Sequence, residues 1–174
     1  MDDRKFKPLK NFISDRTCFG CGDANPAGLK MTFRTDGTTV VSELSVPAHL
    51  CGWNRLVHGG ILSTLMDEIM SWTAIHLLQR LILTKSMQID FLHPVYVGTP
   101  LRLEGRIDRH LSPKEAEVTA DLHIKDGMRR CTHARGRFAL FTAEAMQRMK
   151  IMDKDTVESY TRWIENGGSL GSPE

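Results

Sequence analysis

The stretch that decides the fold reads Val57-His58-Gly59-Gly60-Ile61-Leu62-Ser63-Thr64-Leu65-Met66-Asp67-Glu68. It opens an apolar segment that runs to about Leu83, and from Ile61 to Leu78 nearly every helical face carries Ile, Leu, Met, Trp or Ala. A helix that is apolar on all sides is a buried helix. At about 1.5 Å per residue it would be about 27 Å long, enough to cross a small domain. The sequence therefore predicts a long central helix.

Two neighbouring carboxylates, Asp67 and Glu68, sit in the middle of this helix. Burial of an unpaired carboxylate is costly, so such groups are usually paired, partly solvated or functional. Each acid costs about 2.5–3.5 kcal/mol at the centre of a bilayer, which argues against a membrane span. Two interpretations remain open: a core helix whose acids emerge at one edge, and a catalytic helix.

The glycines at the start of the helix favour the catalytic interpretation. Gly59 and Gly60 leave backbone N–H groups uncovered by any Cβ, at the positive end of the helix dipole, where they suit a developing oxyanion. Asp67 is the candidate base or nucleophile. Glu68 points about 100° away around the helix, and we expect it to be structural or to lie at a dimer seam.

The spacing of these groups predicts a dimer. Seven or eight residues make about two helical turns, so the glycines and Asp67 share a face. They are also about 10–12 Å apart along the axis, so one carbonyl cannot touch both within one helix. It could touch the glycine N–H of one chain and the Asp of another if two copies lie antiparallel across a two-fold axis. We therefore predict a homodimer with two shared active sites.

Length and composition are those of a single globular domain. The chain has 174 residues, 41% of them hydrophobic and 25% charged, with a net charge of only +2, which argues against broad nucleic-acid binding. The first ten residues are charged and contain no apolar signal core. We expect a cytoplasmic protein that binds neither nucleic acid nor membranes.

The four cysteines include one CxxC pair, Cys18 and Cys21. A single CxxC is half a zinc site, which His49, Cys51, His58 or a dimer mate could complete. A redox pair usually follows a strand in a βαβ unit, and no such unit is visible. We favour a tight Gly-rich turn with small buried thiols, and so predict no metal site.

The rest of the chain up to about residue 140 alternates apolar and polar residues, which predicts strands. They lie near residues 29–34, 40–46, 87–91, 101–107, 116–124 and 134–140, with turn signals at Asp36-Gly37, Ser112-Pro113 and Asp126-Gly127. Short turns imply antiparallel neighbours, and one apolar face per strand implies a sheet covered on one side. The predicted fold class is α+β, a curved antiparallel sheet wrapped around one long buried helix.

Both ends of the chain differ from this pattern. Residues 1–17 look like a loosely held arm. Residues 143–166 look helical with a break near Met152, a capping box at Asp155 and Glu158, and a narrow apolar stripe made by Val157, Tyr160 and Ile164. This helical extension would pack on its own domain or on a dimer mate. Gly167-Gly168 would end it.

The chain resembles the hot-dog-fold acyl-CoA thioesterases, specifically the phenylacetate-degradation-type branch. Three pieces carry the resemblance: Cys18 to Leu29 with its CxxCG and NPxGL elements, Val57-His-Gly-Gly60 through Asp67-Glu68, and Met87 to Pro94 with Gly98. The domains are then a 1–17 arm, an 18–142 hot-dog thioesterase domain, and a 143–174 helical extension and tail. The resemblance also implies a homodimer, often paired again into a homotetramer, and coenzyme A as the carrier part of the substrate rather than a cofactor.

The resemblance assigns roles by position. Asp67 aligns with the acid that attacks the thioester or activates water, the N–H groups of Gly59 and Gly60 with the oxyanion donors, and His58 with a residue that shapes the thioester pocket. Thr84 falls where relatives often place a Ser or Thr near the attacking water. Many relatives have an Asn six residues before the His, but here that position is Gly52, and Asn54 is the nearest amide.

Coenzyme A carries phosphates, so a basic rim is expected, and we assign it to Arg130, Arg135 and Arg137 among the arginines of the last strand. Met66, Met70 and Met87 are the expected lining of the acyl pocket. The predicted activity is hydrolysis of an acyl-CoA thioester to the free acid and coenzyme A. The alternatives are an acyl-CoA-binding module without catalysis and a hot-dog dehydratase, for which the sequence lacks a paired His base and acid.

Overall fold

The structure is a computed structural model that describes residues 5–12, 16–125 and 129–166. Its strands and helices are, in chain order, β1 (Lys7–Leu9), β2 (Phe33–Thr35), β3 (Val40–Ser45), α1 (Gly59–Leu78), β4 (Leu81–Phe91), β5 (Pro100–Ser112), β6 (Glu115–Ile124), β7 (Arg129–Phe141), α2 (Ala143–Met149) and α3 (Lys154–Glu165). A short 3-10 helix, Ala48–Leu50, lies in the loop between β3 and α1. The predicted turn at Asp126-Gly127 and helix end at Gly167-Gly168 fall outside the described residues.

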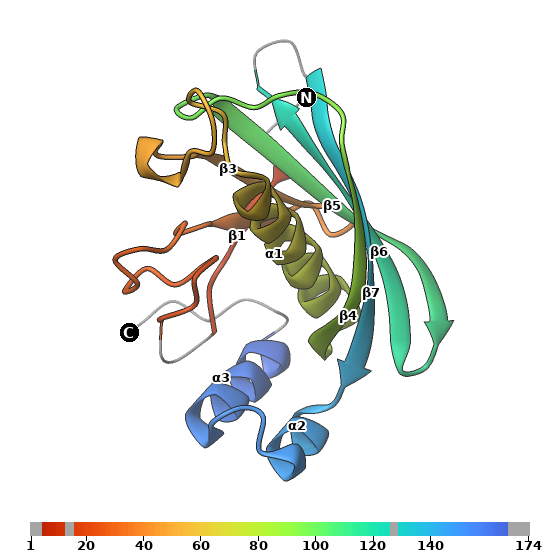
Figure 1. The fold of residues 1–174 in the computed structure, drawn as a ribbon. Coiled ribbons are helices and arrows are strands. Elements are labelled where there is room, and N and C mark those ends of the chain that lie inside the picture. The colour runs from red at the N-terminus through yellow and green to blue at the C-terminus, as the bar shows by residue number, and fades with distance from the viewer. Residues whose placement is uncertain (1–4, 13–15, 126–128, 167–174) are drawn as a thin grey trace.

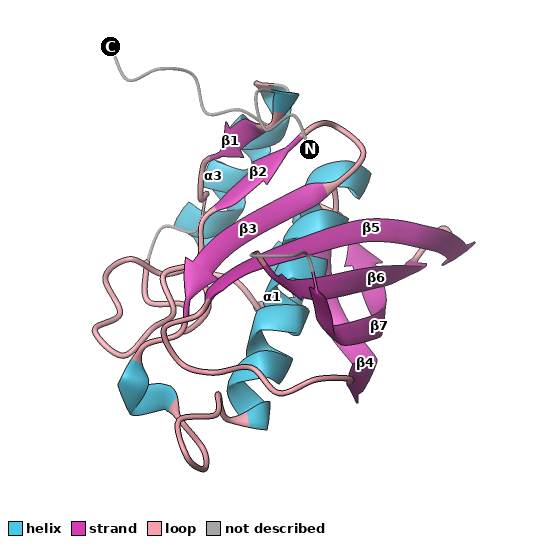
Figure 2. Cartoon of the chain, turned by 90° about the horizontal axis from the view of Figure 1, so that it is seen from above, coloured by secondary structure: helices cyan, strands magenta, loops and turns pink. Residues whose placement is uncertain are grey.

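The seven strands form one antiparallel sheet in the order β1-β2-β3-β5-β6-β7-β4. Figures 1 and 2 show this sheet curving around α1, which confirms the predicted α+β architecture. Strand β4 follows α1 in the chain but lies at the far edge of the sheet, where β7 is its one partner among the described strands. One side of this strand of 11 residues therefore offers its backbone N–H and C=O groups to a further partner.

Helix α1 packs one side against the curved sheet. Leu65, Met66, Ile69 and Met70 have no exposed surface. The helix approaches β5 so closely that a Cβ at Gly105 would lie 2.1 Å from Thr73 Oγ1 and 3.2 Å from Ile69 O. Glycine is therefore needed at this contact between helix and sheet. None of the helices in the described part of the chain has the length and apolarity that a membrane span requires.

Residues 5–12 of the predicted N-terminal arm are packed on the domain rather than loosely held. Strand β1 pairs with β2. Phe12 is only 3% exposed, and its ring centroid lies 5.2–5.7 Å from those of Trp72, Tyr160 and Trp163. The segment is held by aromatic contacts with two helices that come much later in the chain, so no local pattern predicts it.

The C-terminal extension packs on its own domain. Helices α2 and α3 lie beyond the C-terminal end of α1 (Figure 1), and the Trp163 ring lies 5.7 Å from that of His76. The break near Met152 is confirmed. The predicted capping box is wrong: Asp153, not Asp155, caps α3, and its carboxylate accepts from Thr156 N. Trp163, which the predicted stripe omitted, is fully buried.

Candidate functional site

The loop before α1 fixes where the helix begins. Val57 N donates to Val95 O at 2.8 Å, and His58 N donates to Leu50 O at 3.2 Å. His58 then takes an extended conformation, with φ −61° and ψ 137°, and serves as the N-cap of α1. The end of the loop is thus tied to the 3-10 helix of the same loop and to the segment after β4, so the first helical residues have a defined position.

The first N–H groups of α1 differ in how they are used. Gly60 N donates to His58 Nδ1 at 3.0 Å, and Ile61 N donates to His58 O at 2.9 Å. The Gly59 N–H has no partner within the described residues. Of the two glycines predicted to be oxyanion donors, Gly59 therefore has the free N–H, whereas His58 occupies that of Gly60.

A small cavity of about 260 Å³ lies beside the free N–H and is lined by Gly59, Leu62, Phe91, His93 and neighbouring residues. This volume is below the usual range of about 300–1,000 Å³ for a ligand pocket. Met66 and Met70, predicted to line an acyl pocket, have no exposed surface and belong to the core instead, and Met87 is half-buried.

Asp67 and Thr84 lie side by side, as a shared site requires. Thr84 Oγ1 donates to Asp67 Oδ1 at 2.9 Å. Asp67 is half-buried, and burial raises the pKa of its carboxyl above the ordinary value, whereas the Thr84 hydrogen bond acts in the opposite direction. A raised pKa makes the carboxylate a stronger base than an exposed aspartate.

A β-bulge explains how Thr84 reaches the helix. The register of β4 against β7 shifts between Thr84 and Ser86, so Thr84 pairs with buried Phe138 while Ser86 pairs with exposed Arg137. Without the bulge, Thr84 would share the outer face with Ser86, because side chains of a strand alternate between faces. The structure thus places Thr84 on the α1 side of the sheet.

The face of α1 that carries Asp67 is a stripe of small and polar residues. We call it the polar stripe; it consists of Gly60, Ser63, Thr64, Asp67 and Ser71. The hydroxyls of Ser63 and Thr64 donate to the backbone oxygens of Gly59 and Gly60 at 2.9 and 3.0 Å, so these side chains fold onto their own helix. Small side chains of this kind let another helix approach closely.

Glu68 faces a different environment from Asp67. Its carboxylate accepts from Trp72 Nε1 at 3.3 Å and contacts Cys18 Sγ at 3.8 Å. Burial raises the pKa of Glu68 to about 7. The hydrogen bond between the two thiols lowers the pKa of Cys18 to about 5 and raises that of Cys21. His49, Cys51 and His58 do not join this group; Glu68 does.

The three predicted coenzyme A cations lie on the outer face of the sheet, away from α1. Each pairs with an acid of β6: Arg137 with Glu115 at 2.5 Å, Arg130 with Asp121 at 3.3 Å and Arg135 with Glu117 at 3.7 Å. A different arginine, Arg129, lies 2.8 Å from Nδ1 of His93, which lines the cavity beside Gly59.

Gly52, where many relatives have an Asn, lies next to His58. A Cβ on Gly52 would lie 3.5 Å from His58 Cα and 3.6 Å from its Cδ2. An amide side chain at this position would therefore reach the His58 ring. Asn54 does not replace it, because it is exposed in a left-handed turn with φ +45°.

Comparison with known proteins identifies the segment that contains the helix. Residues 54–131 match the family model described as the thioesterase superfamily. This segment belongs to the thioesterase superfamily. The thioesterase segment includes Gly59, Asp67 and Thr84 and leaves Cys18 and Cys21 outside. The comparison with curated proteins found no match.

Solved structures of thioesterase superfamily proteins share the fold, which is the hot-dog fold. One such protein matches 76% of this chain and 66% of its own, with a TM-score of 0.64 and 19% identity. PaaI of the E. coli phenylacetic acid degradation operon matches 65% and 80%, with a TM-score of 0.58 and 20% identity.

A hypothetical thioesterase of Streptococcus pneumoniae TIGR4, solved with coenzyme A, matches 59% of this chain and 81% of its own, with a TM-score of 0.55 and 21% identity. Variants of that protein, one with an aspartate and one with a threonine replaced by alanine, match this chain similarly. At these identities the likeness concerns the fold.

The contact between Thr84 and Asp67 predicts a change in titration. Thr84→Val removes a donor that stabilises the carboxylate, so the pKa of Asp67 should rise further. NMR titration of carbonyl-labelled aspartates measures it. The matched control is Thr64→Val, whose hydroxyl bonds the helix backbone instead. An unchanged or lower pKa in Thr84→Val would show that the hydrogen bond does not tune Asp67.

Proposed function

We propose that this chain is an acyl-CoA thioesterase that hydrolyses an acyl-CoA to the free acid and coenzyme A. One observation carries the proposal: Asp67 has a half-buried carboxylate held by Thr84, on the face of α1 that the sheet leaves uncovered. The superfamily match of residues 54–131 supports a thioester substrate, and the phenylacetate-degradation-type branch is the finer assignment that we propose.

In this mechanism the thioester carbonyl oxygen accepts a hydrogen bond from the Gly59 N–H, which stabilises the charge that develops on that oxygen. Asp67 either takes a proton from the attacking water or attacks the carbonyl carbon itself. The new C–O bond forms, the C–S bond breaks, and the departing coenzyme A thiolate takes up a proton. In the second route water then hydrolyses the acyl–Asp67 anhydride. Thr84 orients the carboxylate in both routes.

The two groups must come from different chains. Eight residues of helix separate Gly59 from Asp67, about 12 Å along the axis. An antiparallel copy of α1 packed on the polar stripe brings the Gly59 N–H of one chain opposite Asp67 of the other. The open edge of β4 lies beside the same surface and can pair with its own copy. We therefore propose a homodimer with two shared sites, which can pair again into a tetramer.

The small cavity at Gly59 is then half of the substrate site, and the second chain supplies the rest. Its apolar lining, Leu62 and Phe91 among others, suits an acyl group or the pantetheine arm. Of the arginines on β7, Arg129 is the best placed for a coenzyme A phosphate, because it lies beside His93 at this cavity. Arg130, Arg135 and Arg137 are already paired with carboxylates.

The second candidate function is an acyl-CoA-binding module without catalysis. The occupied Gly60 N–H and the absence of an amide side chain at Gly52 are the observations that favour it, because both leave fewer groups to polarise the carbonyl or place water. The two functions differ in whether bound acyl-CoA is hydrolysed.

We predict that Asp67→Asn abolishes hydrolysis. The substitution keeps the shape of the side chain but removes the base, so kcat/KM should fall by about 10²–10⁴-fold. A panel of aliphatic and aromatic acyl-CoA substrates, assayed by thiol release, measures it. Asp90→Asn, on the outer face of β4, is the matched control. Hydrolysis at the wild-type rate in Asp67→Asn would refute the mechanism. Saturable binding without turnover by the wild type would favour the binding module.

The antiparallel arrangement also predicts which residues of α1 lie opposite each other across the two-fold axis of the dimer. If Gly59 faces Asp67 of the partner, positions equally far from residue 63 face each other, and Ser63 faces itself. In a chain with the exposed Cys51 replaced by Ser, Ser63→Cys should therefore give disulfide-linked dimers on oxidation. The control is Ser71→Cys on the same stripe, which should not cross-link. Dimers linked through position 71 but not 63 would contradict this register.

A further inference from the structure

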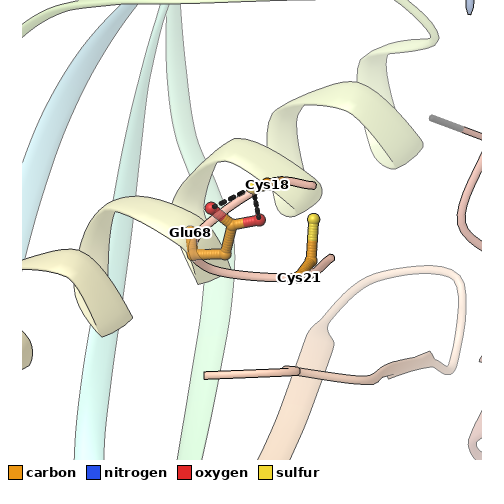
Figure 3. Close-up of side chains that lie close together, drawn as sticks. All are labelled: Cys18, Cys21 and Glu68. Atoms are coloured by element: carbon orange, nitrogen blue, oxygen red, sulfur yellow. Dashed lines mark hydrogen bonds between the residues drawn. The ribbon is translucent and has the colours of Figure 1, made fainter. Parts of the chain in front are cut away.

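Three side chains with metal-binding atoms converge on the side of α1 away from the polar stripe. Cys18 and Cys21 come from the turn before β2, and Glu68 comes from the helix (Figure 3). One ligand atom from each lies within 4.8 Å of the others. Cys18 Sγ is 3.8 and 3.9 Å from the two Glu68 oxygens.

The glycines of the turn permit this convergence. A Cβ at Gly20 would lie 2.4 Å from Glu68 Cδ, so with any larger residue the turn and the carboxylate could not both keep these positions. A Cβ at Gly22 would lie 2.4 Å from Arg16 O. Gly22 N donates to Cys18 O at 2.9 Å, and this hydrogen bond closes the turn. A CxxCG turn of this shape presents both sulfur atoms on one side.

The charge of this cluster favours a bound cation. Glu68 accepts a hydrogen bond from Trp72 Nε1, and within the described residues it makes no ion pair with a lysine or arginine. A buried carboxylate beside two thiols is costly unless a cation compensates it. A divalent cation would bind all three groups and offset this cost.

We propose that Cys18, Cys21 and Glu68 bind a Zn²⁺ ion that ties the turn at residues 18–22 to α1. With Zn–S about 2.3 Å and Zn–O about 2.1 Å, tetrahedral coordination separates sulfur and oxygen by about 3.6 Å. The contacts between Cys18 and Glu68 are within 0.3 Å of this value. Two thiolates select Zn²⁺ over Mg²⁺ or Ca²⁺, which prefer oxygen ligands.

The surrounding residues support these ligands. Trp72 Nε1 holds one oxygen of Glu68, and Asn11 Nδ2 contacts Cys21 Sγ at 3.6 Å. Such outer partners orient metal ligands. Cys18 is only partly buried, so water can reach the fourth position. The ion holds the turn at residues 18–22 against α1, on the side away from Asp67. This role does not depend on the proposed thioesterase activity.

Metal analysis of the full chain tests the proposal. Protein expressed with added Zn²⁺ and purified under reducing conditions without chelators should contain about one Zn²⁺ per chain. Replacement by Co²⁺ should give the thiolate-to-cobalt absorption and the intense visible bands of a tetrahedral site. No bound metal, or a Cys18–Cys21 disulfide that persists under those conditions, would overturn the proposal.

Variants identify the ligands. Cys18→Ser and Cys21→Ser should lose Zn²⁺, and Glu68→Gln should weaken binding by at least the roughly 10–100-fold that loss of an outer partner costs. Cys51→Ser, Cys131→Ser and Asp67→Asn are matched controls that should keep it. If the cysteine variants fail to fold, competition between wild-type protein and a chromophoric chelator for Zn²⁺ still gives the affinity. Retention of Zn²⁺ by Cys18→Ser would overturn the assignment.

Discussion

The packing of α1 into the curved sheet is the interaction on which the rest of the structure depends. Leu65, Met66, Ile69 and Met70 are removed from water completely, each worth about 1.5–3 kcal/mol of transfer free energy. The sheet covers the helix on the side of these residues only. The opposite side carries the polar stripe, whose small and polar side chains do not pack into the hydrophobic core. Asp67 lies on that uncovered side, next to the open edge of β4.

This arrangement gives two adjacent carboxylates different surroundings. Asp67 faces the polar stripe and accepts a hydrogen bond from Thr84, whereas Glu68 faces Cys18, Cys21 and Trp72. Burial raises the pKa of both. Similar groups take different roles when their surroundings differ. In our account one carboxylate serves catalysis and the other serves a metal ion, and the helix separates them by about 100° of rotation.

The sequence predicted the central helix and the antiparallel sheet because both depend on long periodic patterns. The family resemblance also brought Asp67, Gly59 and Thr84 into one hypothesis, although Thr84 lies outside the strand predicted at residues 87–91. The bulge between Thr84 and Ser86 turns Thr84 toward α1, and no local residue pattern predicts this bulge. The contacts of Phe12 and the approach of Cys18 to Glu68 also escaped prediction, because they join residues far apart in the chain. Only the folded chain brings these together.

The central claim is that a complete site needs two chains, and subunit mixing tests it most directly. Gly59→Pro removes the free N–H at the first helical position, which proline tolerates, and His58 before it already has the extended conformation that proline favours. Gly59→Pro chains and Asp67→Asn chains should each be inactive. After equal mixing and random exchange, half of the dimers are mixed and each has one intact site, so activity should return to about a quarter of the wild-type value. No recovery, with subunit exchange verified, would contradict the account.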